Sequence, residues 1–147
     1  MSASKQVSPS VSSILFVCGL NSIRSPMAEV IARAQLENTA FIQSAGIQEG
    51  KRDPFVDATL NEVGLDLGDR QPRVYDPLHD NGFDIIVALS QTAHEKVLRG
   101  TKASAVEVLY WPIDDPTLVK GRRDQIIEAY RGVRSALEKK IKEQFSS

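Results

Sequence analysis

One segment constrains the fold of this chain more than any other: residues 14–26, ILFVCGLNSIRSP. Its first four residues form a short apolar run, which predicts a buried central strand of a parallel sheet. Gly19 and Asn21 tolerate loop backbone angles that other residues resist. The Ser25-Pro26 pair is typical of a helix start, with serine as the N-cap and proline in the first helical position. The segment therefore predicts a strand, a tight loop and a helix in succession.

The loop carries a cysteine and an arginine in the spacing C-x5-R, Cys18 and Arg24. A strand–loop–helix turn directs backbone N–H groups into a concavity at the positive end of the helix, where an oxyanion can bind. A thiol attacks only as its thiolate, which a helix N-terminus and a nearby guanidinium favour. Arg24 can bind two oxygens of a phosphoryl group while Cys18 lies beneath the phosphorus. The alternative is a buried cysteine that packs as a small hydrophobe.

This arrangement suits nucleophilic phosphoryl transfer without a metal. We expect Cys18 and Arg24 to be catalytic, and the phosphate to be bound by the loop residues Gly19, Leu20, Asn21, Ser22, Ile23 and Arg24. No metal site is expected, because the two histidines, His79 and His94, have no ligand spacing.

Residues 18–29, CGLNSIRSPMAE, resemble the phosphate-binding loop of the low-molecular-weight protein tyrosine phosphatase family. The thioredoxin-coupled arsenate reductases share that fold and loop. The resemblance covers about residues 13–145, and it implies a phosphatase-like domain over residues 13–147 that needs no cofactor.

Length and composition restrict the alternatives. The 147 residues fit one domain, and a net charge of −1 gives no reason to expect a nucleic-acid or membrane partner. The single cysteine excludes an intramolecular disulfide and, with no signal peptide, favours the cytoplasm. Residues 1–12 are rich in serine and are expected to form a disordered tail. The chain is expected to be a monomer or a weak homodimer.

Apolar runs alternate with helical patterns along the chain, which predicts an α/β fold with right-handed crossovers. We expect a single domain with a four-stranded parallel sheet and helices on both faces. The expected strands are residues 14–17, 41–44, 84–89 and 106–110. The expected helices are residues 26–38, 53–64 and 122–144, one that Ser90 caps, and a short turn opened by Asp76-Pro77.

A second segment, WPIDDP at residues 111–116, follows the fourth expected strand. Ligands of such sheets bind beyond the carboxyl ends of the strands, so this segment should meet Cys18 at one edge. Transfer of a phosphoryl group to Cys18 expels an alkoxide or phenoxide, which a carboxylic acid can protonate. We expect Asp115 and not Asp114 to be this acid, because Pro116 restricts the backbone of the residue before it and stiffens the loop. The resemblance also assigns the general acid to this Asp-Pro pair. The alternative is that both acids merely form the turn.

Three residues are expected to hold the loop in shape: Asn21, Ser25 and Ser44. Ser25 either caps its helix or donates to the thiolate. Ser44, in the triplet Ser-Ala-Gly, resembles a family serine that supports the loop by hydrogen bonds; the alternative is a plain strand-end turn.

The sequence departs from the family in the residues that recognise phosphotyrosine. Thr117 and Leu118 stand where aromatic residues usually flank the ring, and Ile23 stands where many members have a second cysteine.

The prediction is a phosphatase acting on phosphorylated protein or small phosphate esters through a phosphocysteine, inhibited by phosphate-like oxyanions. A single-cysteine arsenate reductase using an external thiol is the first alternative, because the thioredoxin-coupled relay needs two further cysteines. The second is a non-catalytic phosphate-binding module.

Overall fold

The computed structural model describes residues 12–37 and 39–145. Its centre is a parallel sheet of four strands in the order β2-β1-β3-β4, which confirms the expected fold class. The strands are β1 (Ser13–Cys18), β2 (Phe41–Gly46), β3 (Ile85–Ala88) and β4 (Glu107–Tyr110). The register pairs Cys18 with Gly46 and Val17 with Ala88, so the carboxyl ends of β1, β2 and β3 meet at one edge.

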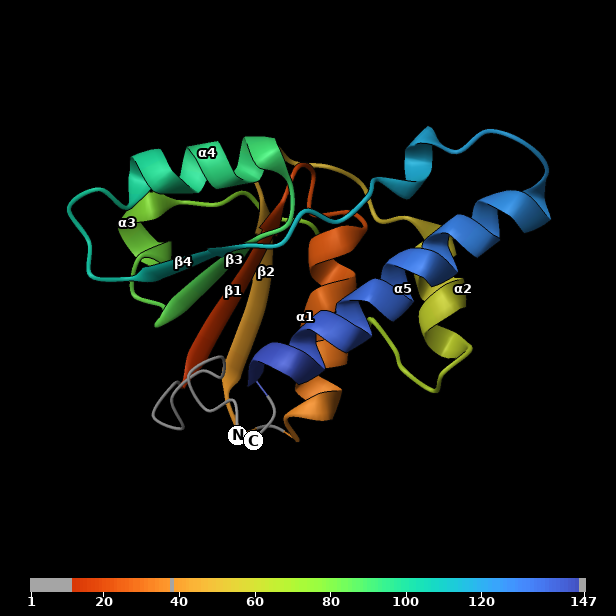
Figure 1. Ribbon diagram of the computed structural model, residues 1–147, viewed down its shortest axis with the longest axis horizontal. Coiled ribbons are helices and arrows are strands. Elements are labelled where there is room, and N and C mark those ends of the chain that lie inside the picture. Colours follow the sequence, from red (N-terminus) through yellow and green to blue (C-terminus); the bar gives the residue numbers. More distant parts are fainter. Residues whose placement is uncertain (1–11, 38, 146–147) are drawn as a thin grey trace.

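Helices cover both faces of the sheet, as Figure 1 shows. On one face lie α1 (Arg24–Gln35), α2 (Pro54–Asn61) and α5 (Arg123–Phe145), and on the other lie α3 (Pro77–Asp80) and α4 (Gln91–Gly100). Side chains of β1 alternate between the two cores. Phe16 packs in the cluster with α1 and α5, and Leu15 and Val17 pack in the cluster with α4. Every residue of β1 after Ser13 is buried, which places Cys18 at the end of a rigid central strand.

Most helix starts follow from local side-chain chemistry. Asp53, Asp76 and Ser90 each accept a backbone N–H in the first turn of the helix that follows, which satisfies a donor that has no partner inside the helix. The helix that starts after Asp53 ends at Asn61, earlier than expected, and Gly64 lies in the turn beyond it with φ +77°.

The cap predicted for α1 is wrong. The helix begins at Arg24, so Ser25 lies inside its first turn, and Ile23 occupies the N-cap position without a side-chain hydrogen bond. The physical reason is that Ser25 is fully buried and its hydroxyl bonds Cys18, Asn21 and Ala45 instead.

The expected disordered tail lies outside the described residues except for Ser12. The Ser12 N–H and hydroxyl donate to Asp84 Oδ2 at 2.7 and 3.0 Å. These bonds hold Ser12 beside Asp84, the residue before β3. In the described part of the chain, no helix is both long enough and apolar enough to cross a membrane.

Candidate active site

The candidate site is built on the loop that joins β1 to α1, residues 19–23. Asn21 adopts a left-handed backbone conformation with φ 55°, as its residue type allows. The segment after β2 packs tightly on this loop: the Ile47 N–H donates to Cys18 O at 3.1 Å, and the Gln48 N–H donates to Gly19 O at 3.0 Å. A Cβ on Gly46 would lie 2.6 Å from Asn21 N, so only glycine fits there. The loop is therefore held from the β2 side by backbone contacts.

Cys18 lies at the bottom of this loop and is 2% exposed. Its Sγ atom is 2.9 Å from Ser25 Oγ and accepts the Ser25 N–H at 3.4 Å. Hydrogen bonds donated to sulfur favour the thiolate over the thiol. The sequence left two roles open for Ser25, capping its helix or donating to the thiolate. The structure places its hydroxyl against Cys18 and not at the N-cap.

The Ser25 hydroxyl is the centre of a small buried network. It accepts from Asn21 Nδ2 at 2.8 Å and can donate to Ala45 O at 3.2 Å. Because Ser25 Oγ has one proton, it can give that proton either to Ala45 O or to Cys18 Sγ. Ser25 and Asn21 are thus joined to each other by a hydrogen bond, and Ser25 also joins the loop to β2 through Ala45.

The hydroxyl of Ser44, which was expected to support the loop, has a partner on α1. It donates to Glu29 Oε1 at 2.6 Å, on the side of β2 that faces α1. Glu29 is 2% exposed and also pairs with Arg33 and Arg70, each at 2.7 Å. Burial raises the pKa of Glu29, and the Ser44 hydrogen bond and the two guanidinium groups act against that rise. A buried carboxylate is costly unless hydrogen-bond donors surround it. The Ser44 hydroxyl is one of the donors to Glu29, which explains its direction.

Arg24 links the loop to the segment after β4. Its Nη1 donates to Ile113 O at 2.9 Å, two residues before Asp115. The two motifs that the sequence placed at one sheet edge therefore do meet, through Arg24. This bond uses one nitrogen of a guanidinium that has five N–H donors, so others are available for an oxyanion.

Asp115 forms the turn that follows the segment bonded by Arg24. Its Oδ1 accepts from the Thr117 N–H and hydroxyl at 3.0 and 2.6 Å and caps the 3₁₀ turn Pro116–Leu118. The Tyr130 hydroxyl donates to Asp53 Oδ2 at 2.7 Å, and burial, this bond and the charges of Asp53 and Asp115 raise the Tyr130 pKa. The acid segment, α2 and α5 thus converge at Tyr130. Asp114, by contrast, is exposed.

Trp111 belongs to the core. It is 5% exposed and packs between Phe16 and Phe145, with ring centroids 6.0 and 5.9 Å away. Leu118, two residues after Pro116, is 74% exposed.

Comparison with known proteins agrees with this geometry. Residues 13–147 match the sequence model described as "Low molecular weight phosphotyrosine protein phosphatase". The chain belongs to this family. The match covers the whole sheet, the loop with Cys18 and Arg24, and the segment with Asp115.

Individual relatives within the family have two kinds of name. An arsenate reductase from Bacillus subtilis is 29% identical over 130 residues, covering 88% of this chain and 92% of the relative. The fold matches the crystal structure of the tyrosine phosphatase AmsI from Erwinia amylovora, with a TM-score of 0.78, 24% identity and 90% of each chain covered. It also matches the tyrosine phosphatase Wzb from Escherichia coli K30 in complex with sulphate, with a TM-score of 0.77, 22% identity and coverage of 90% and 94%.

Sequence reasoning missed two ion pairs outside the loop, Glu29 with Arg70 and Asp80 with Arg73, and the bond by which the Arg73 N–H reaches Asn21 in the loop. The signal for Glu29 was present, because it is an acid on the same helix face as buried apolar residues. Arg70 and Arg73 lie in a segment without a periodic pattern, and only the tertiary structure brings Arg70 to Glu29 and Arg73 to Asn21 and Asp80.

Proposed function

We propose that this chain is a metal-independent phosphatase that hydrolyses phosphate monoesters through a phosphocysteine. The observation that carries the proposal is the link from nucleophile to acid. Cys18 Sγ lies against Ser25, and the adjacent Arg24 bonds the carbonyl of Ile113, in the segment that bears Asp115. The proposed nucleophile and the proposed anion-binding guanidinium thus lie beside the segment that carries the proposed acid, which supports the assignment.

The reaction has two steps. The Cys18 thiolate attacks phosphorus, and the bond from phosphorus to the leaving oxygen breaks as Asp115 gives that oxygen a proton. Arg24 and the backbone N–H groups of residues 19–24 bind the phosphoryl oxygens, where negative charge is spread in the transition state. Asp115 then takes a proton from a water molecule that attacks phosphorus, which releases phosphate and restores the thiolate.

The substrates are proposed to be phosphorylated protein or small aryl phosphates, with little preference for phosphotyrosine. At the two positions after Asp115-Pro116 the chain has Thr117 and the exposed Leu118, so these positions offer no ring to stack on a phenyl group. Such a stack is worth about 0.5–1.5 kcal/mol beyond burial, which corresponds to roughly two- to tenfold in affinity. Tetrahedral oxyanions such as phosphate and arsenate are expected to inhibit by occupying the loop, as sulphate accompanies the related Wzb.

Arsenate reduction with an external thiol is the second candidate, and the Bacillus subtilis relative named arsenate reductase favours it. Cys18 would attack arsenic and displace water. An external thiol would then attack the Cys18 sulfur, so that arsenic(V) leaves as arsenite and the two thiols become a mixed disulfide. A second external thiol would reduce that disulfide. An intramolecular relay is not available to this chain, since Cys18 is its single cysteine.

A side-by-side assay separates the two activities. Hydrolysis of para-nitrophenyl phosphate and thiol-dependent reduction of arsenate are measured on the same preparation, with Cys18→Ser as the control for both. Phosphatase turnover that Cys18→Ser abolishes is the expected result. Arsenate turnover in the presence of a small thiol, without aryl phosphatase activity, would assign the chain to the reductase.

The role of Asp115 is tested with two leaving groups. Asp115→Asn should slow an alkyl phosphate far more than an activated aryl phosphate, because general acid catalysis contributes roughly 10²–10⁴-fold and an activated phenolate needs little of it. Asp114→Asn is the matched control and should leave the leaving-group dependence unchanged. Equal losses for both substrates in Asp115→Asn would indicate that the carboxylate acts only through its cap on Thr117.

A further inference from the structure

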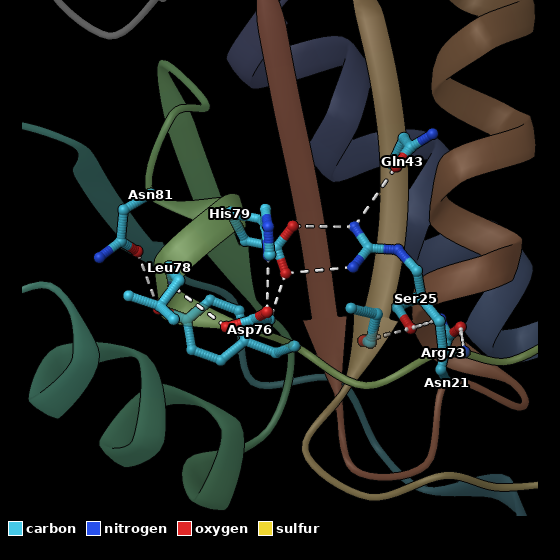
Figure 2. Close-up of polar contacts among 11 residues, drawn as sticks. Asn21, Ser25, Gln43, Arg73, Asp76, Leu78, His79 and Asn81 are labelled. Carbon is cyan, nitrogen blue, oxygen red and sulfur yellow. Dashed lines mark hydrogen bonds and ion pairs between the residues drawn. The ribbon is translucent and has the colours of Figure 1, made fainter.

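Arg73 lies at the centre of a clamp between the phosphate loop and α3. Its Nη1 and Nη2 donate to the two carboxylate oxygens of Asp80, both at 3.1 Å, and Nη2 also donates to Gln43 Oε1 at 3.3 Å. Figure 2 shows the guanidinium of Arg73 pointing toward Gln43 and the green helix α3, with Asn21 and Ser25 at the other end of the residue. The two-pronged pair fixes both the position and the plane of the guanidinium.

Asp80 is itself held in place. It is 4% exposed, and its Oδ2 also accepts the Asp76 N–H at 2.8 Å. A carboxylate this deeply buried depends on its partners, because an unpaired charge away from water costs several kcal/mol. The clamp is therefore anchored in the fold on the α3 side.

The other end of Arg73 acts on the loop. Its backbone N–H donates to Asn21 Oδ1 at 2.9 Å, from a position 52 residues away in sequence. A side-chain amide has one acceptor and one donor end, so a donor on Oδ1 decides which way the amide points. With Oδ1 directed at Arg73, Nδ2 is directed at Ser25 Oγ, 2.8 Å away.

The orientation of Asn21 matters for the sulfur atom. The Asn21 Nδ2 donates to the same Ser25 oxygen whose proton can reach Cys18 Sγ across 2.9 Å. A hydroxyl that accepts a hydrogen bond becomes a better donor, since bonds in a chain polarise one another. If Asn21 turned its oxygen to Ser25, the Ser25 hydroxyl would donate its proton to that oxygen, and the proton would be drawn away from sulfur.

We propose that Arg73 is a positioning residue for Cys18: its guanidinium, fixed on Asp80, holds its own N–H against Asn21, which sets the Ser25 hydroxyl to stabilise the thiolate. The inference rests on the proposed role of Cys18 as a nucleophile. The charged residue at the end of the loop is Arg24, whose guanidinium bonds Ile113 O, and Arg73 acts in addition to it, through hydrogen bonds.

The test is the pH dependence of Cys18 alkylation by iodoacetamide in Arg73→Gln and, separately, in Asp80→Asn. Each change removes the two-pronged ionic pair. Arg73 lines a cavity of about 670 Å³ together with Gln43 and residues 64–71, so a glutamine at this position should cause no steric clash. We expect the alkylation midpoint to move up by about one pH unit, so that alkylation well below the midpoint slows roughly tenfold. Arg73→Lys, which keeps a charged donor for Asp80, should restore part of this loss.

Arg131→Gln is the matched control. The Arg131 side chain is 39% exposed, against 36% for Arg73, and it also binds both oxygens of a carboxylate, that of Glu62, but it lies on α5 and its partner lies just after α2. Arg131→Gln should lower the thermal midpoint of unfolding without moving the pH midpoint of Cys18 alkylation. Folded Arg73→Gln and Asp80→Asn proteins with the wild-type alkylation midpoint would overturn the proposal. Because alkylation needs no substrate, this result is independent of whether the chain is a phosphatase or an arsenate reductase.

Discussion

The hydroxyl of Ser25 gives the sharpest test of how the loop favours the Cys18 thiolate. Ser25→Ala removes the group that lies 2.9 Å from Cys18 Sγ and leaves the weaker Ser25 N–H contact at 3.4 Å. A hydrogen bond to a charged group contributes about 1.5–3 kcal/mol. At about 1.4 kcal/mol for each pH unit, its loss should raise the pH midpoint of Cys18 alkylation by about one to two units. Turnover at low pH should fall in proportion to the thiolate fraction.

The assay is alkylation by iodoacetamide across a range of pH, followed by mass spectrometry of the intact chain. Ser22→Ala is the control, because Ser22 lies in the same loop and its hydroxyl donates to Leu20 O at 3.5 Å. The control should keep the wild-type midpoint. The reasoning is refuted if Ser25→Ala also keeps it while the protein stays folded. An equal rise in both variants would instead indicate a general loosening of the loop.

Two further predictions concern binding and acid stability. Cys18→Ser should abolish turnover but keep phosphate affinity, measured by calorimetry, because Arg24 and the loop N–H groups remain; more than a few per cent of residual activity would place the nucleophile elsewhere. Hydrogen bonds from Arg131 and Arg134 lower the pKa of Glu62 from 4.5 to about 2, so its contribution to stability is present above pH 4.5 and is lost as the pH falls toward 2. Glu62→Gln should therefore flatten the fall of the urea midpoint over that range, whereas Glu143→Gln, an exposed acid on α5, should not.

The sequence determined the parts of this protein that depend on local patterns. The apolar run before Cys18, the C-x5-R spacing and the Asp-Pro and Ser caps each contain their own physical cause within a few residues. They predicted the parallel sheet, the position of the loop at the end of β1, and its approach to the segment after β4. Alternation of strands and helices leaves few topologies open, which explains why the fold class was correct.

The tertiary structure decided which partner each polar side chain takes. Ser25 reads as a helix cap, yet its burial among Cys18, Asn21 and Ala45 makes it part of the loop. Ser44 turns to Glu29, because that buried carboxylate needs a donor and lies on the same side of β2. The Arg73 clamp joins residues 52 apart through a segment with no periodic pattern, so no local signal reveals it. Hydrogen-bond partners are set by packing between distant segments, and one sequence read locally does not contain that information.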